Sequence, residues 1–201
     1  MKRFKDFIAE SSLHVFDIDD TLFHTTAQVH VKKGGKTVQK LSSAEFNSHK
    51  LPDGHHYDYS EFQSAHKFDT ESVPNHRMMD KMKGIHASVK SSGKGKVIMN
   101  TARQDFDDKH RFLDTFRKHG VDIDDIHVHR AGNIKGMSVA QAKTEVIRKH
   151  LNTGNYKRAS LYDDSKENLN HFLELKKEHP DVHLRAYHVQ PDGSIKHHKS
   201  E

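Results

Sequence analysis

From about residue 95 onward, short apolar runs alternate with segments whose apolar residues recur at helical spacing. The helical segments end near Gly120, Gly154 and Pro180, residue types that commonly end helices. A similar run near the N-terminus brings the apolar runs to Leu13–Phe16, Val97–Met99, Ile126–Val128, Ser160–Tyr162 and Val182–Val189. Such alternation predicts right-handed crossovers and a mostly parallel sheet with helices on both faces. We therefore expect an α/β fold, a three-layer Rossmann-like sandwich around a five-stranded sheet.

The interval 24–95 does not follow this rhythm. Valines on either side of the Lys-Gly-Gly-Lys stretch at 33–36 predict a β-hairpin with a glycine turn. Further along, Met78, Met79 and Met82 form an apolar stripe at helical spacing, which we interpret as a packing surface. We therefore predict a core domain of residues 1–23 and 96–201, interrupted by a small α+β insertion of residues 24–95. The polar end, Lys196–Glu201, is expected to fray.

The composition excludes several classes of site and location. The 201 residues include no cysteine, so disulfides, thiolate zinc sites and cysteine nucleophiles are excluded. No apolar stretch approaches the roughly 18 residues of a membrane span, and we expect a cytoplasmic protein without a membrane partner. The formal net charge of +5 favours anionic partners such as phosphate esters or nucleic acid. No obligate protein partner is evident.

The first apolar run leads into two carboxylates, Asp17 and Asp19. Residues two apart in an extended chain point to the same side, and open α/β sheets bind ligands at the carboxyl ends of their strands. Two carboxylates repel each other unless a cation intervenes, and ligand sets made only of oxygen favour Mg²⁺. One carboxylate would then attack phosphorus, while the other, protonated, would serve the leaving group. The pair predicts magnesium-dependent phosphoryl chemistry.

Phe16–Leu22, with the sequence FDIDDTL, resembles the first signature of the haloacid dehalogenase (HAD) superfamily in its phosphatase form. That family carries three further signatures in a fixed order, and this chain has residues that match each one. They are Thr101 at the end of the second apolar run, Lys143 near the start of a helical segment, and Asp163-Asp164 after the fourth run. Lys135 is the alternative to Lys143. The resemblance covers roughly residues 13–23 and 96–189.

The resemblance implies a division of roles among these residues. Asp17 would be the nucleophile and Asp19 the general acid and base. Thr101 would donate a hydrogen bond to a phosphoryl oxygen, and Lys143 would neutralise charge on the phosphoryl group. Arg103 would contact the rest of the substrate, because the Thr-Ala-Arg stretch at 101–103 resembles a loop of polynucleotide 3′-phosphatases. The implied Mg²⁺ ligands are Asp17, the backbone carbonyl of Asp19, Asp163 and Asp164.

The expected function is magnesium-dependent hydrolysis of a phosphomonoester, a nucleotide or a small phosphorylated molecule, through an aspartyl-phosphate. The insertion lies where this family places its first-position cap. One alternative is a phosphatase of polynucleotide 3′- or 5′-ends, which Arg103 and the positive net charge motivate. The alternative of another class is a non-catalytic protein that binds nucleic acid or lies inside a phage head and retains the fold.

A second resemblance concerns Met1–Glu10. This stretch is similar to the head-targeting peptide on internal proteins of large tailed phages, and Ile8-Ala9-Glu10 is similar to the site where their prohead protease cuts. The resemblance implies a phage-encoded protein, located in the host cytoplasm or packaged in the head. A plain amphipathic helix is the alternative for this segment.

Overall fold

The computed structural model describes residues 11–199, the side chains of Ala44 and Asn47 apart. Its centre is a six-stranded sheet with the order β11-β10-β9-β1-β7-β8. Five neighbouring strands run parallel: β1 (Ser12–Phe16), β7 (Gly95–Thr101), β8 (His127–Arg130), β9 (Arg158–Asp163) and β10 (His183–Val189). Because β1 lies between β7 and β9, its carboxyl end opens at the middle of the sheet, where ligands bind in open α/β folds.

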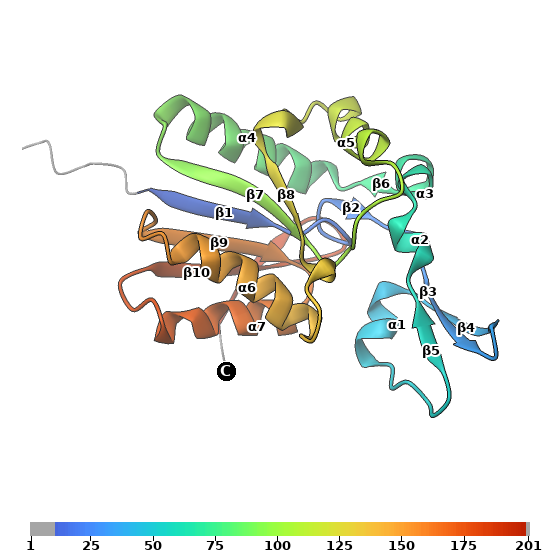
Figure 1. Cartoon of the computed structure of the whole chain (residues 1–201). Helices are drawn as coiled ribbons and strands as arrows, with labels where there is room; N and C mark the ends of the chain where they lie inside the picture. Colours follow the sequence, from blue (N-terminus) through green and yellow to red (C-terminus); the bar gives the residue numbers. More distant parts are fainter. Residues whose placement is uncertain (1–10, 200–201) are drawn as a thin grey trace, which may run out of the picture.

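Helices cover both faces of this sheet, as Figure 1 shows. On one face lie α4 (His76–Ser92) and α5 (Lys109–Lys118), and on the other lie α6 (Val139–Leu151) and α7 (Lys166–Glu174). Strand geometry sends alternate side chains of β7 to opposite faces. Val97 and Met99 pack in the core cluster with α4 and α5, whereas Ile98 packs in the cluster with α6 and α7. The predicted α/β fold with a mostly parallel sheet is therefore confirmed.

The predicted number of strands is wrong by one. The sixth strand, β11 (Ile195–His198), pairs antiparallel with β10 at the edge of the sheet. It also occupies part of the segment that we expected to fray. Two of its four residues are exposed and three of them are polar, so β11 lacks the apolar pattern that predicts a strand. Its position depends instead on backbone pairing with β10, which an edge strand achieves without an apolar sequence.

The predicted insertion holds a second, smaller unit that Figure 1 shows standing apart from the main sheet. Strands β3 (Val29–Lys33) and β4 (Lys36–Leu41) form the expected hairpin, and β5 (His56–Asp58) pairs with β3 to complete a three-stranded sheet. Gly34 and Gly35 both have positive φ, 54° and 80°, the conformation that a tight hairpin turn requires. Helices α1 (Ser43–Ser48) and α2 (Ser60–Gln63) follow β4 and β5. We call residues 29–63 the cap.

The rest of the insertion packs against the main sheet. Helix α4 buries Met78, Met79 and Met82 in one cluster with Phe16 and Val97, so the methionine stripe is a packing surface, as predicted. Helix α3 (Ala65–Glu71) lies beside α5. The short strands β2 (Phe23–His24) and β6 (Val73–Pro74) pair antiparallel and close the insertion at its base. Among residues 11–199, three 3₁₀ turns complete the fold: η2 (Ile123–Asp125), η3 (Ala131–Asn133) and η4 (Leu175–Lys177).

Within residues 11–199, every helix is too short or too polar to cross a bilayer. Met1–Glu10 lies outside the described residues, so its resemblance to a head-targeting peptide stays a prediction.

Candidate active site

Asp17 directly follows β1 and extends the pairing of that strand with β9, since its backbone N–H donates to the carbonyl of Tyr162 at 3.0 Å. The chain then turns tightly, because the carbonyl of Ile18 accepts hydrogen bonds from the N–H groups of Leu22 and Phe23, both at 2.9 Å. Asp20 sits in this turn with a φ of 56°, the left-handed region that Asp tolerates better than most residues. The turn leaves Asp17 and Asp19 lining one cavity, as their spacing predicts.

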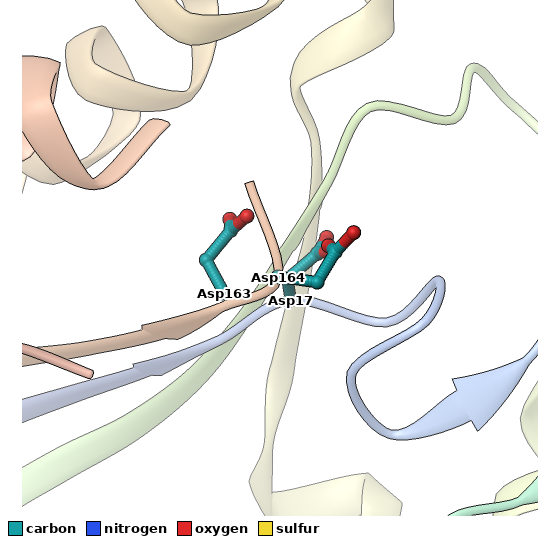
Figure 2. Close-up of side chains that lie close together, drawn as sticks. All are labelled: Asp17, Asp163 and Asp164. Carbon is teal, nitrogen blue, oxygen red and sulfur yellow. The ribbon is translucent and has the colours of Figure 1, made fainter. Parts of the chain in front are cut away.

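The end of the neighbouring strand β9 brings two more carboxylates to the same place. Oxygen atoms of Asp17, Asp163 and Asp164 all lie within 4.8 Å of one another. Figure 2 shows the three side chains rising together from the ends of the two strands. Asp163 is fully buried, and its Oδ1 accepts from the backbone N–H of Ser165 and from Nδ2 of Asn168, both at 2.9 Å. These contacts hold Asp163 in place against the repulsion of its neighbours.

Lys143 supplies the positive charge among these carboxylates. Its Nζ lies 2.6 Å from Oδ1 of Asp17 and 2.9 Å from Oδ2 of Asp163, and its side chain is only 5% exposed. Lys143 is in the second turn of α6, which begins after the N-cap Ser138. A helical side chain points back toward the N-terminus of its helix, so a lysine inside the helix still reaches the strand ends. Lys135, the alternative, is exposed on the preceding loop.

The electrostatics of this cluster are unbalanced. Burial raises the pKa of Asp17 well above its usual range, Lys143 opposes this, and the other carboxylates add to it. Burial, followed by repulsion from Asp163, raises the pKa of Asp164 to about 7. Burial lowers the pKa of Lys143, but the attraction of Asp163 and Asp17 outweighs burial and the net pKa is raised. One ammonium group does not compensate the buried carboxylates, so the cluster favours a further cation.

Thr101 and Arg103 join the cluster from the end of β7. The Thr101 hydroxyl is fully buried and accepts from the backbone N–H of Arg103 at 3.1 Å. The guanidinium of Arg103 donates through Nε and Nη2 to the carboxylate of Asp19, with distances of 2.6–3.0 Å. Its remaining hydrogen bonds go to Oγ1 of Thr25 at 3.0 Å and to the carbonyl of Phe62 at 2.9 Å.

The guanidinium of Arg103 therefore makes its hydrogen bonds to other groups of the protein. Its side chain is 1% exposed and its guanidinium lies 4.9 Å from the ring centres of both Phe62 and Phe68. The adjacent Gly132 permits this close packing, since a Cβ there would lie 2.1 Å from the carbonyl oxygen of Ala102. The predicted contact of Arg103 with substrate stays a prediction. The observed contacts favour another role, in which Arg103 orients Asp19.

Sequence reasoning missed three residues that support the site. Asn168 donates to Asp163, the side chain of Asn100 donates to the carbonyl of Lys143 at 2.9 Å, and Thr25 accepts from Arg103. Asn100 directly follows the apolar run Val97–Met99 and precedes Thr101, and a polar residue at such a position is a usable signal. Thr25 carries no such signal, because only the tertiary fold brings it to Arg103.

A cavity of about 480 Å³ opens over the cluster, between the carboxyl end of the sheet and the cap. The catalytic candidates Asp17, Asp19 and Lys143 line its floor, together with Asp164. Aromatic residues of the cap line another part of its wall. The cap therefore takes part in forming the candidate site.

Comparison with solved structures finds a similar fold. The structure is similar to the HAD domain of the effector protein Lem4 from Legionella pneumophila, with a TM-score of 0.55 and 10% sequence identity over 90% of this chain and 87% of that one. The chain has a HAD-like fold. No protein-family model and no curated protein matches the sequence. At this identity the similarity concerns the fold alone, so the chemistry depends on the site residues themselves.

Proposed function

We propose that this protein is a magnesium-dependent phosphomonoester hydrolase in which Asp17 is transiently phosphorylated. One observation carries the proposal: carboxylate oxygens of Asp17, Asp163 and Asp164 lie within 4.8 Å of one another, the Lys143 ammonium pairs with Asp17 and Asp163, and Asp17, Asp164 and Lys143 line the cavity. A buried carboxylate beside an ammonium group and other acids suits attack on a phosphorus atom whose oxygens need positive charge. The HAD-like fold supports this proposal as an analogy.

The donor set fits Mg²⁺. Asp17, Asp163 and Asp164 offer only carboxylate oxygens, the ligand type that this ion prefers, and the raised pKa values of Asp17 and Asp164 indicate missing positive charge. These three residues would hold the ion. When bound, it would neutralise the charge on the carboxylates and on the phosphoryl oxygens.

The chain's own residues account for the two chemical steps. The Asp17 carboxylate attacks phosphorus, and the bond from phosphorus to the leaving oxygen breaks as Asp19 donates its proton to that oxygen. In the second step Asp19 accepts a proton from water, whose oxygen attacks the phosphorus of the aspartyl-phosphate. The bond from phosphorus to the Asp17 oxygen breaks, which releases inorganic phosphate and restores the Asp17 carboxylate. Arg103 fixes the orientation of the Asp19 side chain through its bonds to both carboxylate oxygens. Lys143 stays close to the charge that develops near Asp17.

A second candidate is the dephosphorylation of nucleic-acid ends. The hairpin β3–β4 carries four lysines and no acidic residue, and within the described part of the chain Lys33, Lys36 and Lys40 have no ion-pair partner. None of these three lysines lines the cavity, however. If nucleic-acid ends are the substrates, KM should rise steeply with salt. Binding releases the counterions of the nucleic acid, and this release is less favourable at high salt. A KM that does not change with salt excludes this candidate.

The test is phosphate release with Mg²⁺ by wild type and by Asp17→Asn, on nucleotides, a generic aryl phosphate and 3′-phosphorylated oligonucleotides. The isosteric substitution removes the nucleophile with little change in shape, so activity should fall by about 10³-fold or more. Asp181→Asn, a substitution of an exposed aspartate on the surface, is the matched control and should retain activity. Turnover by Asp17→Asn at the wild-type rate would refute the mechanism, and inactivity of wild type on every substrate would favour a binding protein.

A further inference from the structure

Exposed apolar side chains gather at the candidate active site. Among the described residues, six large apolar side chains are exposed, and Tyr59, Met137 and Val139 line the cavity over Asp17. They are 38%, 47% and 44% exposed, respectively. Only 33% of the chain is hydrophobic, so this grouping does not reflect a generally apolar surface. An exposed apolar patch that adjoins polar groups marks a binding surface.

One side of this patch belongs to the cap. Phe46, Tyr59 and Phe62 line the cavity from there. The rings of Phe46 and Tyr59 meet edge to face, with centres 5.7 Å apart, and Phe46 makes a similar contact with Tyr57 at 4.9 Å. Phe46 and Phe62 also pack against the small apolar core of the cap. These rings therefore form a preorganised aromatic wall, and such a wall favours flat ligands.

The other side belongs to the core domain. Ile134, Met137 and Val139 line the cavity between η3 and the start of α6. Val139 precedes Lys143 by four residues, so the two side chains lie on the same face of α6, about one helical turn or 6 Å apart along the axis. A phosphoryl group beside the Lys143 ammonium therefore places the next part of its ester against Val139 and Met137.

The charged side chains that line the cavity limit which charged groups the leaving group of the ester can carry. The cavity lining includes two cationic side chains, Arg103 and Lys143, and both are bound to carboxylates of the site. The remaining charged groups outside the three converging aspartates are acidic, and include Asp20 and Glu167. Within the described lining, no free cation is available to bind a second phosphate group. A leaving group with further negative charge would meet carboxylates there.

We propose that the cavity binds the planar aromatic part of an uncharged leaving group, so that the preferred substrates are monophosphates of nucleosides or aryl alcohols. The ring would lie between the cap wall of Phe46 and Tyr59 and the core wall of Met137 and Val139. This inference rests on the proposed phosphatase function and names its substrate class. A volume of about 480 Å³ lies within the usual range of small-molecule sites.

The test compares phosphate esters with and without an aromatic group. We would measure kcat/KM of wild type, with Mg²⁺, on the four common nucleoside 5′-monophosphates and 1-naphthyl phosphate, against ribose 5-phosphate. Stacking of one ring predicts a preference of about tenfold or more for the best aromatic ester. Adenosine 3′,5′-bisphosphate should react more slowly than adenosine 5′-monophosphate, because its second phosphate meets carboxylates. Equal or faster reaction of ribose 5-phosphate than of every aromatic ester would overturn the proposal.

Variants assign the preference to the walls. Val139→Ser combined with Met137→Ser should reduce the preference for the aromatic ester by about fivefold, whereas Val38→Ser, at another exposed valine that lies outside the cavity, should leave it unchanged. An unchanged preference in the double variant would refute the assignment of the core wall.

Binding separates this inference from the proposed function. Calorimetric titration of Asp17→Asn with the same esters measures ring recognition without turnover. If wild type shows no turnover but Asp17→Asn binds the aromatic esters more tightly than ribose 5-phosphate, the subsite is supported and the phosphatase function is refuted. Turnover by wild type, together with equal binding of ribose 5-phosphate, would support the function and refute the subsite.

Discussion

Arg103 shows how a single side chain can connect several parts of this site. Its guanidinium bonds to Asp19 in the loop after β1, to Thr25, and to the carbonyl of Phe62 in the cap. A planar guanidinium with donors in a fixed fork is suited to such a junction, and lysine is not an equivalent replacement. The position of Asp19 is therefore tied to the position of the cap.

The buried Arg103–Asp19 pair leads to a prediction about stability. Arg103→Met leaves Asp19 without its partner, so the free energy of unfolding should fall by about 3 kcal/mol. Asp19→Asn should also destabilise, and the double variant should lose less than the sum of the two single losses, because neither substitution then strands a charge. Urea unfolding of the four proteins measures this coupling. Strictly additive losses would show that the two side chains do not interact.

The protonation of His129 should make the stability of the protein depend on pH. Burial, and then the nearby His127 and His150, lower the pKa of His129 from 6.5 to about 3, and its Nε2 lies 3.0 Å from Nε2 of His150. The unfolded chain therefore binds the proton more readily, so this residue's contribution to stability is complete above pH 6.5 and declines as the pH falls toward 3. His129→Gln should lose less stability than wild type between pH 7 and about 4 in urea unfolding.

The matched control for this prediction is His66→Gln, which changes an exposed histidine in α3. This control should follow the pH dependence of wild type. If His129→Gln also follows wild type, protonation of His129 does not contribute to acid sensitivity.

At the residue scale, the site was predictable where local pattern and topology agree. Asp163 ends β9, and Asp17 and Asp164 directly follow β1 and β9, two neighbouring strands in the central part of a parallel sheet, so their convergence follows from the order of elements alone. The orientation of Arg103 was not predictable in this way. Its partner Thr25 and the cap carbonyl of Phe62 reach it only through the folding of the insertion.

At the scale of elements, burial decides which strands a sequence reveals. The runs that became β1, β7 and β9 lie at the centre of the sheet and are largely buried, and their mostly apolar residues identify them. The hairpin β3–β4 was evident from its glycine turn between two segments that contain valine. Strand β11 has neither signal, since it is a short polar edge strand whose position follows from pairing with β10. The sequence therefore offers no basis for predicting β11.

Two helices begin with the same type of N-cap, and the comparison of these helices leads to a prediction at the scale of elements. Ser138 begins α6 and Ser42 begins α1, and both make a capping box, with Gln141 and Glu45 respectively. Loss of an N-cap hydroxyl destabilises a helix by about 1 kcal/mol. Ser138→Ala should lower the global free energy of unfolding by this amount, because α6 packs on the main sheet. Ser42→Ala should act mainly on the cap, where α1 lies.

Urea unfolding and amide hydrogen exchange together measure this difference. Ser42→Ala should speed exchange within residues 29–63 with a smaller change in the unfolding midpoint. Equal shifts of the midpoint in the two variants would show that cap and core unfold as one cooperative unit.

For the whole molecule, the main question is how firmly the cap is held over the catalytic floor. The loop after β7 holds the base of the cap, since Gln63 donates to Gln104 at 2.6 Å and the backbone N–H of Asp107 donates to the carbonyl of Gln63 at 3.0 Å. The same loop carries Arg103. A displacement of the cap would therefore disturb the loop that orients Asp19, so substrate access and acid–base geometry are structurally linked.

The last prediction concerns Mg²⁺ and the stability of the whole protein. Without the ion, Asp164 is a partly buried carboxyl group that meets repulsion from Asp163, and its pKa is raised to about 7. A carboxyl group whose folded pKa is raised in this way destabilises the protein increasingly as the pH rises from its ordinary pKa of 3.8 to about 7, and the loss of stability is complete above that pH. Metal-free Asp164→Asn should therefore be at least as stable as wild type at pH 8, a pH above this raised pKa.

Mg²⁺ should reverse this order, because an ion that binds only the folded state stabilises it by about 2.7 kcal/mol at a concentration of 100 times its Kd. Wild type and the surface control Asp181→Asn should gain this stability, whereas Asp164→Asn and Asp163→Asn, each with one carboxylate fewer, should gain much less. Thermal unfolding with Mg²⁺ and with a chelator measures both effects. Equal gains in all four proteins would place the ion elsewhere, whereas the crossing of wild type and Asp164→Asn would show that the carboxylates repel each other until a cation joins them.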